Sequence, residues 1–88
     1  MRYKIYLSRE AEKFLSRLGR GEEEKIIKRI EKLGEDPEHF GEFRGNFWVL
    51  KIGKTGYRVS YRFSKEEKIV KIGAIERRSS SDYKRRFY

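Results

Sequence analysis

The stretch "YRVSYRF", residues 57–63, alternates apolar and polar side chains. Successive side chains of a β-strand point to opposite faces, so this stretch predicts a strand with two different faces. The first face carries Tyr57, Val59, Tyr61 and Phe63. The second face carries Arg58, Ser60 and Arg62. The strand is therefore expected to pack a core on one side and to present two arginines on the other.

Similar runs lie on both sides of this strand. "FWVLKI" at residues 47–52 and "KIVKIGAIE" at residues 68–76 are rich in the residues that favour strands. The short links "GKTG" and "SKEE" that join the three runs are typical of antiparallel hairpins. Residues 2–7, "RYKIYL", alternate in the same way and predict a first strand.

Two helices are predicted between the first strand and the other three. Ser8 is a suitable N-cap for a helix over about residues 9–18, and residues 22–34 carry a second apolar stripe that ends at Gly34. Residues 35–45 are expected to form a loop, and residues 77–88 a short C-terminal helix. The order βααβββ plus this helix predicts an α+β fold, in which the helical hairpin covers one face of an antiparallel sheet.

The length and composition limit the function. With 88 residues, the chain is expected to be a single domain over residues 1–88. It contains no cysteine and one histidine, so we expect no metal site and no cofactor. No apolar run is long enough to span a bilayer and no signal peptide is recognisable, so we expect a cytoplasmic protein without a membrane partner.

The net charge of +9 is segregated along the chain. Residues 1–42 contain ten basic and ten acidic side chains, whereas residues 43–88 contain thirteen basic and four acidic ones. Solubility alone does not require such segregation. The second half is therefore expected to meet a polyanion, and nucleic acid is the favoured class.

The period of two also places cations from the neighbouring strands beside Arg58. If Trp48, Leu50 and Ile52 face the core, Lys51 faces the other way. If Val70, Ile72 and Ala74 face the core, Lys71 and Arg77 join the arginines. Further cations are expected at the rim of this basic face, namely Arg44, Lys54, Arg78 and the C-terminal tail. The sequence thus predicts a phosphate-binding surface.

These residues resemble the RelE/ParE superfamily of toxins from toxin-antitoxin pairs. The similarity is carried by "FRG" at 43–45, "WVLKIGKTGYRVSY" at 48–61, "IVKIGAIERR" at 69–78 and the downstream Tyr83. It covers nearly the whole chain, including the order of the elements, and implies a single RelE-like toxin domain. RelE-type members are cytosolic ribonucleases that cut mRNA in the ribosomal A site, and ParE-type members inhibit DNA gyrase. Members of both types are neutralised by an antitoxin.

The resemblance implies a RelE-type catalytic set of Lys51, Arg58, Arg77 and Tyr83, with Val49 in place of the first of two family lysines. The implied reaction is metal-free attack of a ribose 2′-OH on the adjacent phosphate. Arg58 and Arg77 would stabilise the phosphorane charge, with Arg77 also a candidate proton donor, and Lys51 would act as the base. Tyr83 would stack on a base or orient the nucleotide. The residues expected to bind RNA around this set are Arg44, Lys54, Arg62, Lys71, Arg78, Lys84, Arg85 and Arg86.

The sequence therefore favours the toxin of a type II toxin-antitoxin system that acts as a ribosome-dependent mRNA endonuclease. Its expected partners are a cognate acidic antitoxin, the ribosome and mRNA, and the toxin is expected to be a monomer that assembles with its antitoxin. Two alternatives remain open. One is a ParE-like inhibitor of DNA gyrase or topoisomerase without nuclease activity, and the other is a non-catalytic RNA-binding module.

Overall fold

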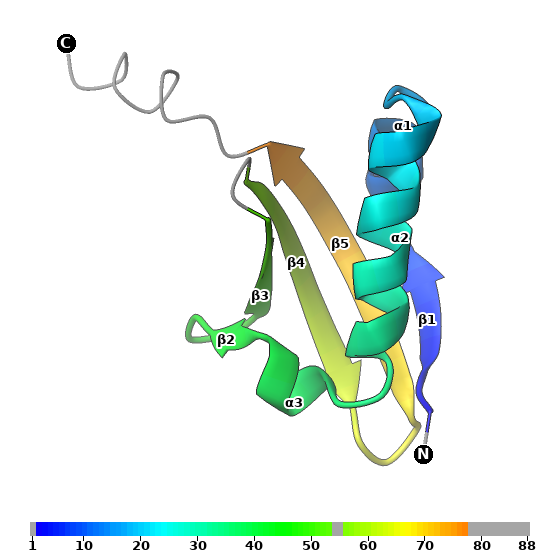
Figure 1. Cartoon of the computed structure of the whole chain (residues 1–88). Helices are drawn as coiled ribbons and strands as arrows, with labels where there is room; N and C mark the ends of the chain where they lie inside the picture. Colours follow the sequence, from blue (N-terminus) through cyan, green and yellow to red (C-terminus); the bar gives the residue numbers. More distant parts are fainter. Residues whose placement is uncertain (1, 54–55, 78–88) are drawn as a thin grey trace, which may run out of the picture.

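The computed structural model describes residues 2–53 and 56–77 (Figure 1). The helices are α1 (Arg9–Ser16), α2 (Arg20–Leu33) and α3 (Pro37–Phe40). The strands are β1 (Lys4–Leu7), β2 (Glu42–Phe43), β3 (Trp48–Ile52), β4 (Tyr57–Ser64) and β5 (Ile69–Arg77). The predicted C-terminal helix lies outside the described residues from residue 78 onward.

The five strands form one sheet in the order β1-β5-β4-β3-β2, so the expected α+β class is confirmed. The sheet is mixed rather than wholly antiparallel, because β1 pairs parallel to β5 while the other pairs are antiparallel. The reason lies in the helices. α2 returns the chain to the end of the sheet where β1 begins, and there the Tyr3 amide donates a hydrogen bond to the Gly34 carbonyl (2.8 Å). β3 and β5 therefore run in the same direction as β1.

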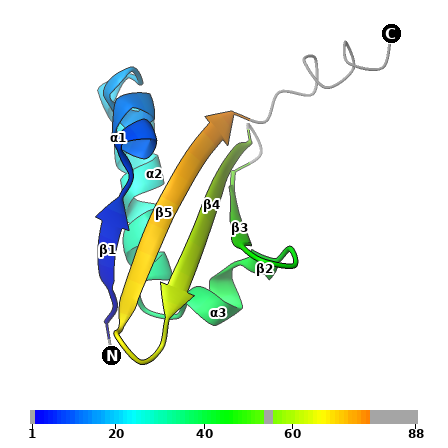
Figure 2. The same cartoon turned by 180° about the vertical axis from the view of Figure 1, so that it is seen from behind.

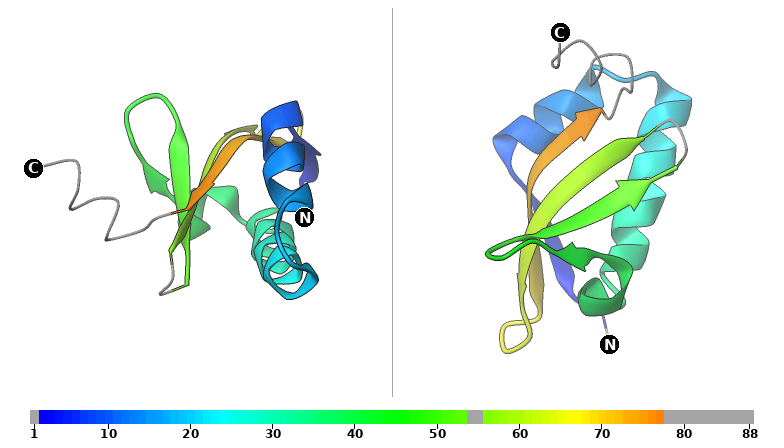
Figure 3. Two further views of the ribbon diagram at one scale, coloured as in Figure 1. Left: turned by 90° about the horizontal axis from the view of Figure 1, so that it is seen from above. Right: turned by 90° about the vertical axis from the view of Figure 1, so that its left-hand side faces the viewer.

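The helical pair covers one face of the sheet, as predicted, and lies on one side of it in Figure 3. Ser8 caps α1 by accepting a hydrogen bond from the Ala11 amide (3.1 Å), and its hydroxyl donates to the Gly73 carbonyl of β5 (2.6 Å). The core between helices and sheet contains the apolar face predicted for residues 57–63. Its buried members include Ile26, Ile30, Leu33, Leu50, Ile52, Tyr57, Val59, Tyr61, Val70, Ile72 and Ile75.

The segment expected to be a loop, residues 35–45, contains two short elements. Asp36 caps α3 through its side chain, which accepts from the His39 amide (3.3 Å), and Pro37 occupies the first turn. The buried Tyr61 hydroxyl donates to the Pro37 carbonyl and ties α3 to β4. β2 then pairs with β3, so that Glu42 lies opposite Val49. Elements of four and two residues are too short to show periodicity in the sequence.

A bulge in β5 corrects the predicted orientation of its C-terminal half. Ser60 pairs with Ala74 whereas Tyr61 pairs with Ile72, which leaves Gly73 as an extra residue in β5. One extra residue reverses the facing of all residues beyond it. Ile75 is therefore buried in the core in place of Ala74. The expected placement of Arg77 with Arg58 is wrong, because Arg77 lies opposite Tyr57 on the helix side.

Candidate nucleic-acid interface

The face of the sheet opposite the helices is the candidate site and is called the open face below. Figure 2 shows β4 and β5 from this side, with no helix in front of them. The register places charged side chains from all of the strands on it. The basic members are Lys4, Lys51, Arg58, Arg62 and Lys71, and the acidic members are Glu42 and Glu76. The predicted cationic surface is thus present in the described part of the chain, with two carboxylates within it.

The centre of the open face is a cross-strand pair of cations. Lys51 of β3 and Arg58 of β4 are direct partners in the antiparallel ladder, and both are exposed. Side chains of direct partners lie close to one another in a sheet, so a phosphate bound here would meet both. This juxtaposition of Lys51 and Arg58 agrees with the prediction from the sequence.

Glu42 is a candidate site residue that was not predicted from the sequence. Its Oε2 atom lies 3.3 Å from Lys51 Nζ and 3.8 Å from an Arg44 guanidinium nitrogen. Glu42 reaches this position because β2 pairs with β3, and β2 was expected to be loop. The only signal in the sequence was its place directly before the "FRG" turn. A carboxylate among cations gives the open face a proton acceptor beside its phosphate-binding groups.

Arg77 belongs to a different cluster, on the helix side of the sheet. Its Nη2 atom donates to the Tyr57 hydroxyl at 3.4 Å, and its guanidinium carbon lies 5.6 Å from the centre of the Tyr57 ring. The Tyr57 hydroxyl donates to Glu22 of α2 (2.8 Å). Burial and this hydrogen bond to Glu22 raise the pKa of Tyr57. The cluster joins the start of β4 and the end of β5 to α2, while Glu76 occupies the position beside Arg58 on the open face.

The other predicted residues fall into two groups. Arg62 and Lys71 are cross-strand partners on the open face, and Arg44 lies at the turn between β2 and β3. Among the described residues, neither Arg62 nor Lys71 forms an ion pair. The remaining predicted residues, Lys54, Arg78, Tyr83, Lys84, Arg85 and Arg86, lie outside the described residues.

Metal and membrane features were also sought in the described ranges 2–53 and 56–77. They contain no group of three or more histidine, cysteine, aspartate or glutamate side chains placed to hold a metal ion. None of the three helices in these ranges combines the length and the apolar character needed to cross a membrane.

Comparison with known proteins gives one family. A family model described as "ParE toxin of type II toxin-antitoxin system, parDE" matches residues 5–81. A search of curated proteins found no match.

Solved structures with a similar fold include RelE toxins and their antitoxin complexes. The isolated Escherichia coli RelE toxin is 24% identical, with a TM-score of 0.75 over 98% of this chain and 99% of that one. The RelBE2 toxin-antitoxin complex of Mycobacterium tuberculosis gives 20% identity and a TM-score of 0.77 over 89% of this chain and 100% of that one. The RelE-RelB complex of Pyrococcus horikoshii gives 22% identity and a TM-score of 0.67 over 89% and 97%. Because these sequence identities are low, the structural similarity establishes the fold alone.

Proposed function

The chain belongs to the ParE toxin family of type II toxin-antitoxin systems, and from the groups on its open face we propose that it is a toxin that cuts mRNA on the ribosome. The observation that carries this proposal is the exposed Lys51–Arg58 pair with the Glu42 carboxylate beside it. This arrangement combines groups that bind a phosphate with a group that accepts a proton. The proposed site of action is the cytoplasm, where mRNA is translated.

The proposed reaction is attack of a ribose 2′-OH on the adjacent phosphate. The O2′–P bond forms, the P–O5′ bond breaks, and the products are a 2′,3′-cyclic phosphate and a free 5′-hydroxyl. The 2′-OH must lose a proton, the leaving O5′ must gain one, and the phosphorane charge must be stabilised. No step in this sequence needs a metal ion or a redox partner.

We propose roles for the groups of the open face that differ from those expected from the sequence. A carboxylate can accept a proton whereas an ammonium group cannot, so Glu42, which is ion-paired with Lys51 and Arg44, replaces Lys51 as the proposed base. Lys51 and Arg58 then bind the phosphate and stabilise the charge that develops on it, and solvent water supplies the proton that O5′ gains. Arg77 contributes only if its guanidinium leaves Tyr57 and reaches around the end of β5. Tyr83 remains a proposed nucleotide-orienting residue.

The test is single-turnover cleavage on ribosomes programmed with mRNA, with the new 5′ ends mapped by primer extension. Arg58→Ala should slow cleavage by about a hundredfold, or about 2.7 kcal/mol, while ribosome affinity falls much less. Glu42→Gln keeps the shape of the side chain but cannot accept the proton, so it should slow cleavage by about a hundredfold or more while ribosome affinity is retained. Arg29→Ala, an exposed arginine on α2, is the matched control. If the variants slow cleavage only in proportion to lost binding, the open face is a docking surface without catalysis.

A second candidate is inhibition of DNA gyrase, because the matching family model is that of the parDE toxin. Such a toxin would bind a topoisomerase and cut no RNA. A supercoiling assay with purified gyrase separates the two functions. Inhibition of supercoiling together with unchanged mRNA 5′ ends would replace the nuclease proposal with this one.

A cognate antitoxin is the proposed protein partner. Similar folds occur in toxin-antitoxin complexes from M. tuberculosis and P. horikoshii. An acidic antitoxin would complement the cations of the open face, and we expect it to cover this face or to displace the tail that carries Tyr83. The toxin itself is proposed to be a monomer that assembles with this antitoxin.

A further inference from the structure

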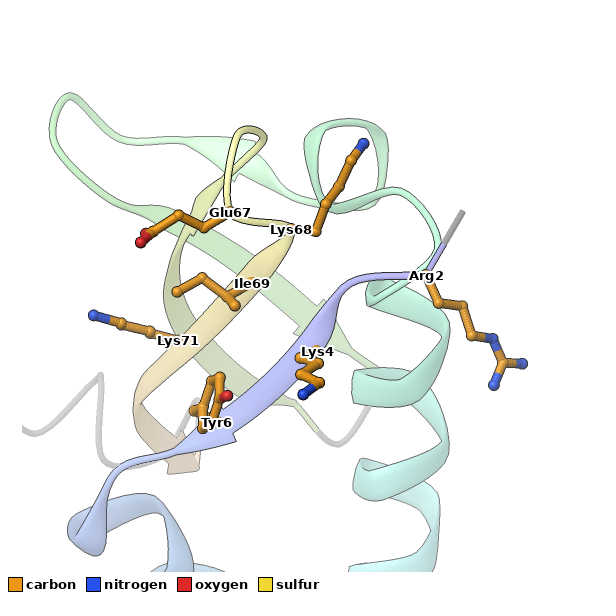
Figure 4. A pocket seen from close by; sticks show the side chains of 7 residues that line it. All are labelled: Arg2, Lys4, Tyr6, Glu67, Lys68, Ile69 and Lys71. Carbon is orange, nitrogen blue, oxygen red and sulfur yellow. The ribbon is translucent and has the colours of Figure 1, made fainter.

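A second feature of the open face lies at the β1–β5 edge, away from the Lys51–Arg58 pair. It is a hollow of about 660 Å³, and we call it the edge hollow (Figure 4). Its lining residues are Arg2, Lys4, Tyr6, Glu67, Lys68, Ile69 and Lys71. The lining thus combines four cations and one acid with an aromatic and an aliphatic side chain. The nuclease proposal does not use this part of the molecule.

Tyr6 is the feature of the edge hollow that calls for an explanation. Its side chain is 51% exposed, and it forms no aromatic pair among the described residues. Lys71 is its cross-strand partner, and Ile69 of β5 lies on the same side of the sheet (Figure 4). The solvent-exposed Tyr6 ring and the neighbouring Ile69 side chain together form a flat apolar surface that no other part of the fold covers in the described residues.

The charges around Tyr6 are suited to an anion. Lys4 and Lys71 lie on the open face beside it, and among the described residues neither forms an ion pair. Lys68 is engaged elsewhere, since its Nζ atom lies 5.2 Å from the centre of the Tyr3 ring, and Arg2 points away from the hollow. The available cations are therefore the two lysines that flank the Tyr6 ring.

Cations of the open face lie between the edge hollow and the proposed cleavage site. Lys71 pairs with Arg62 of β4, and Arg62 lies four residues from Arg58 on the same strand and the same face. Four residues of a strand span about 13 Å, and β4 and β1 are two strand spacings, or about 10 Å, apart. A row of cations thus leads across the open face from Arg58 through Arg62 and Lys71 to Tyr6.

We propose that the edge hollow is a docking subsite for single-stranded RNA, in which the Tyr6 ring stacks on one unpaired base while Lys4 and Lys71 bind the flanking phosphates. An aromatic ring between cations is the combination that binds unstacked RNA without regard to its sequence. An acidic protein segment would use the lysines but has no need of an aromatic face. The subsite rests on the proposed function, because it takes the same strand of RNA as the cleavage site.

The test is binding of fluorescein-labelled oligoadenylate to the full chain, measured by anisotropy. All variants are compared in an Arg58→Ala background, in which cleavage of the RNA is expected to be about a hundredfold slower. Tyr6→Leu should weaken binding about tenfold, whereas Tyr6→Phe should retain it within about twofold. Phe40→Leu, at another exposed aromatic residue (42% exposed, on α3), is the matched control and should leave binding unchanged.

Lys71→Ala should lower the slope of log affinity against log salt by about one, and Lys28→Ala on α2 should not.

A second readout does not depend on variants. The ring protons of Tyr6 should shift upfield in the NMR spectrum when oligoadenylate is added, because a stacked base shields them.

The subsite is overturned if Tyr6→Leu leaves the RNA affinity of the Arg58→Ala parent unchanged, or if Tyr6→Leu weakens only the binding of the cognate antitoxin. Its failure is distinct from failure of the nuclease proposal. Tyr6-dependent binding by a chain that cuts no mRNA supports the subsite and rejects the nuclease, whereas cleavage with Tyr6-independent binding rejects the subsite alone.

Discussion

Gly41→Ala should destabilise the protein strongly, although residue 41 lies outside the helices and strands. Gly41 has extended backbone angles (φ −120°, ψ 176°) that any residue adopts, so the backbone itself is no obstacle to alanine. The obstacle is Tyr61. A Cβ atom at position 41 would lie 1.9 Å from the Tyr61 hydroxyl oxygen and 2.8 Å from the ring carbon that carries it.

The size of the effect follows from how firmly Tyr61 is held. The Tyr61 side chain is 1% exposed, its ring lies 6.4 Å from that of Trp48, and its hydroxyl donates to the Pro37 carbonyl. Overfilling such a site costs about 1–3 kcal/mol, and loss of the hydrogen bond adds about 0.5–1.5 kcal/mol. The free energy of unfolding should therefore fall by about 2–4 kcal/mol.

Urea denaturation followed by the fluorescence of Trp48 measures this change, because Trp48 is the sole tryptophan and lies beside Tyr61. Gly21→Ala is the matched control. A Cβ atom at residue 21 meets nothing within 4 Å, and alanine in α2 should stabilise the protein by up to about 1 kcal/mol.

A double-mutant cycle with Tyr61→Phe tests the cause. Removing the hydroxyl removes the shortest of the three contacts, so Gly41→Ala should cost less in the Tyr61→Phe background. The steric argument is refuted if the urea midpoint of Gly41→Ala equals that of Gly21→Ala. It is also refuted if Gly41→Ala lowers the free energy of unfolding equally with Tyr61 and with Phe at position 61.

Two further predictions concern pH and the antitoxin. Burial raises the pKa of both Tyr57 and Tyr61 above 10.0, so the folded state holds these phenol protons more tightly than the unfolded state does. That stabilisation is present below pH 10 and is lost as the pH rises through the folded-state pKa values. The urea midpoint should therefore fall above pH 10, and it should fall less steeply in Tyr57→Phe. A urea midpoint that does not change with pH would contradict this prediction. For the antitoxin, Arg58 should be protected from arginine-selective modification in the complex, as read by mass spectrometry, and equal reactivity in the free toxin would exclude masking of the open face.

Much of the site could be predicted from local alternation. The period of two in residues 57–63 places Arg58 and Arg62 on one face, and the hairpin to the preceding strand adds Lys51. The structure confirms these placements because burial of the apolar face leaves a strand one way to orient. The α+β class and the helical pair follow from patterns of the same kind.

The sequence did not reveal the elements that depend on contacts distant in the chain. The parallel partner of β1 is set by where α2 returns the chain, and the position of Glu42 is set by a two-residue strand without periodicity of its own. The edge hollow exists only because β1 and β5, which are more than sixty residues apart in sequence, lie side by side.

The position of Arg77 shows most clearly what sequence patterns predict and what only strand pairing reveals. Composition and alternation determined by themselves that this chain folds around a two-faced strand and gathers its excess positive charge in its second half. Which side of the sheet Arg77 occupies was decided only in the tertiary structure, by the bulge at Gly73. The physical reason is that the side-chain period of a strand is two, so one extra residue reverses every later side chain, and only the pairing with β4 reveals that the extra residue is there.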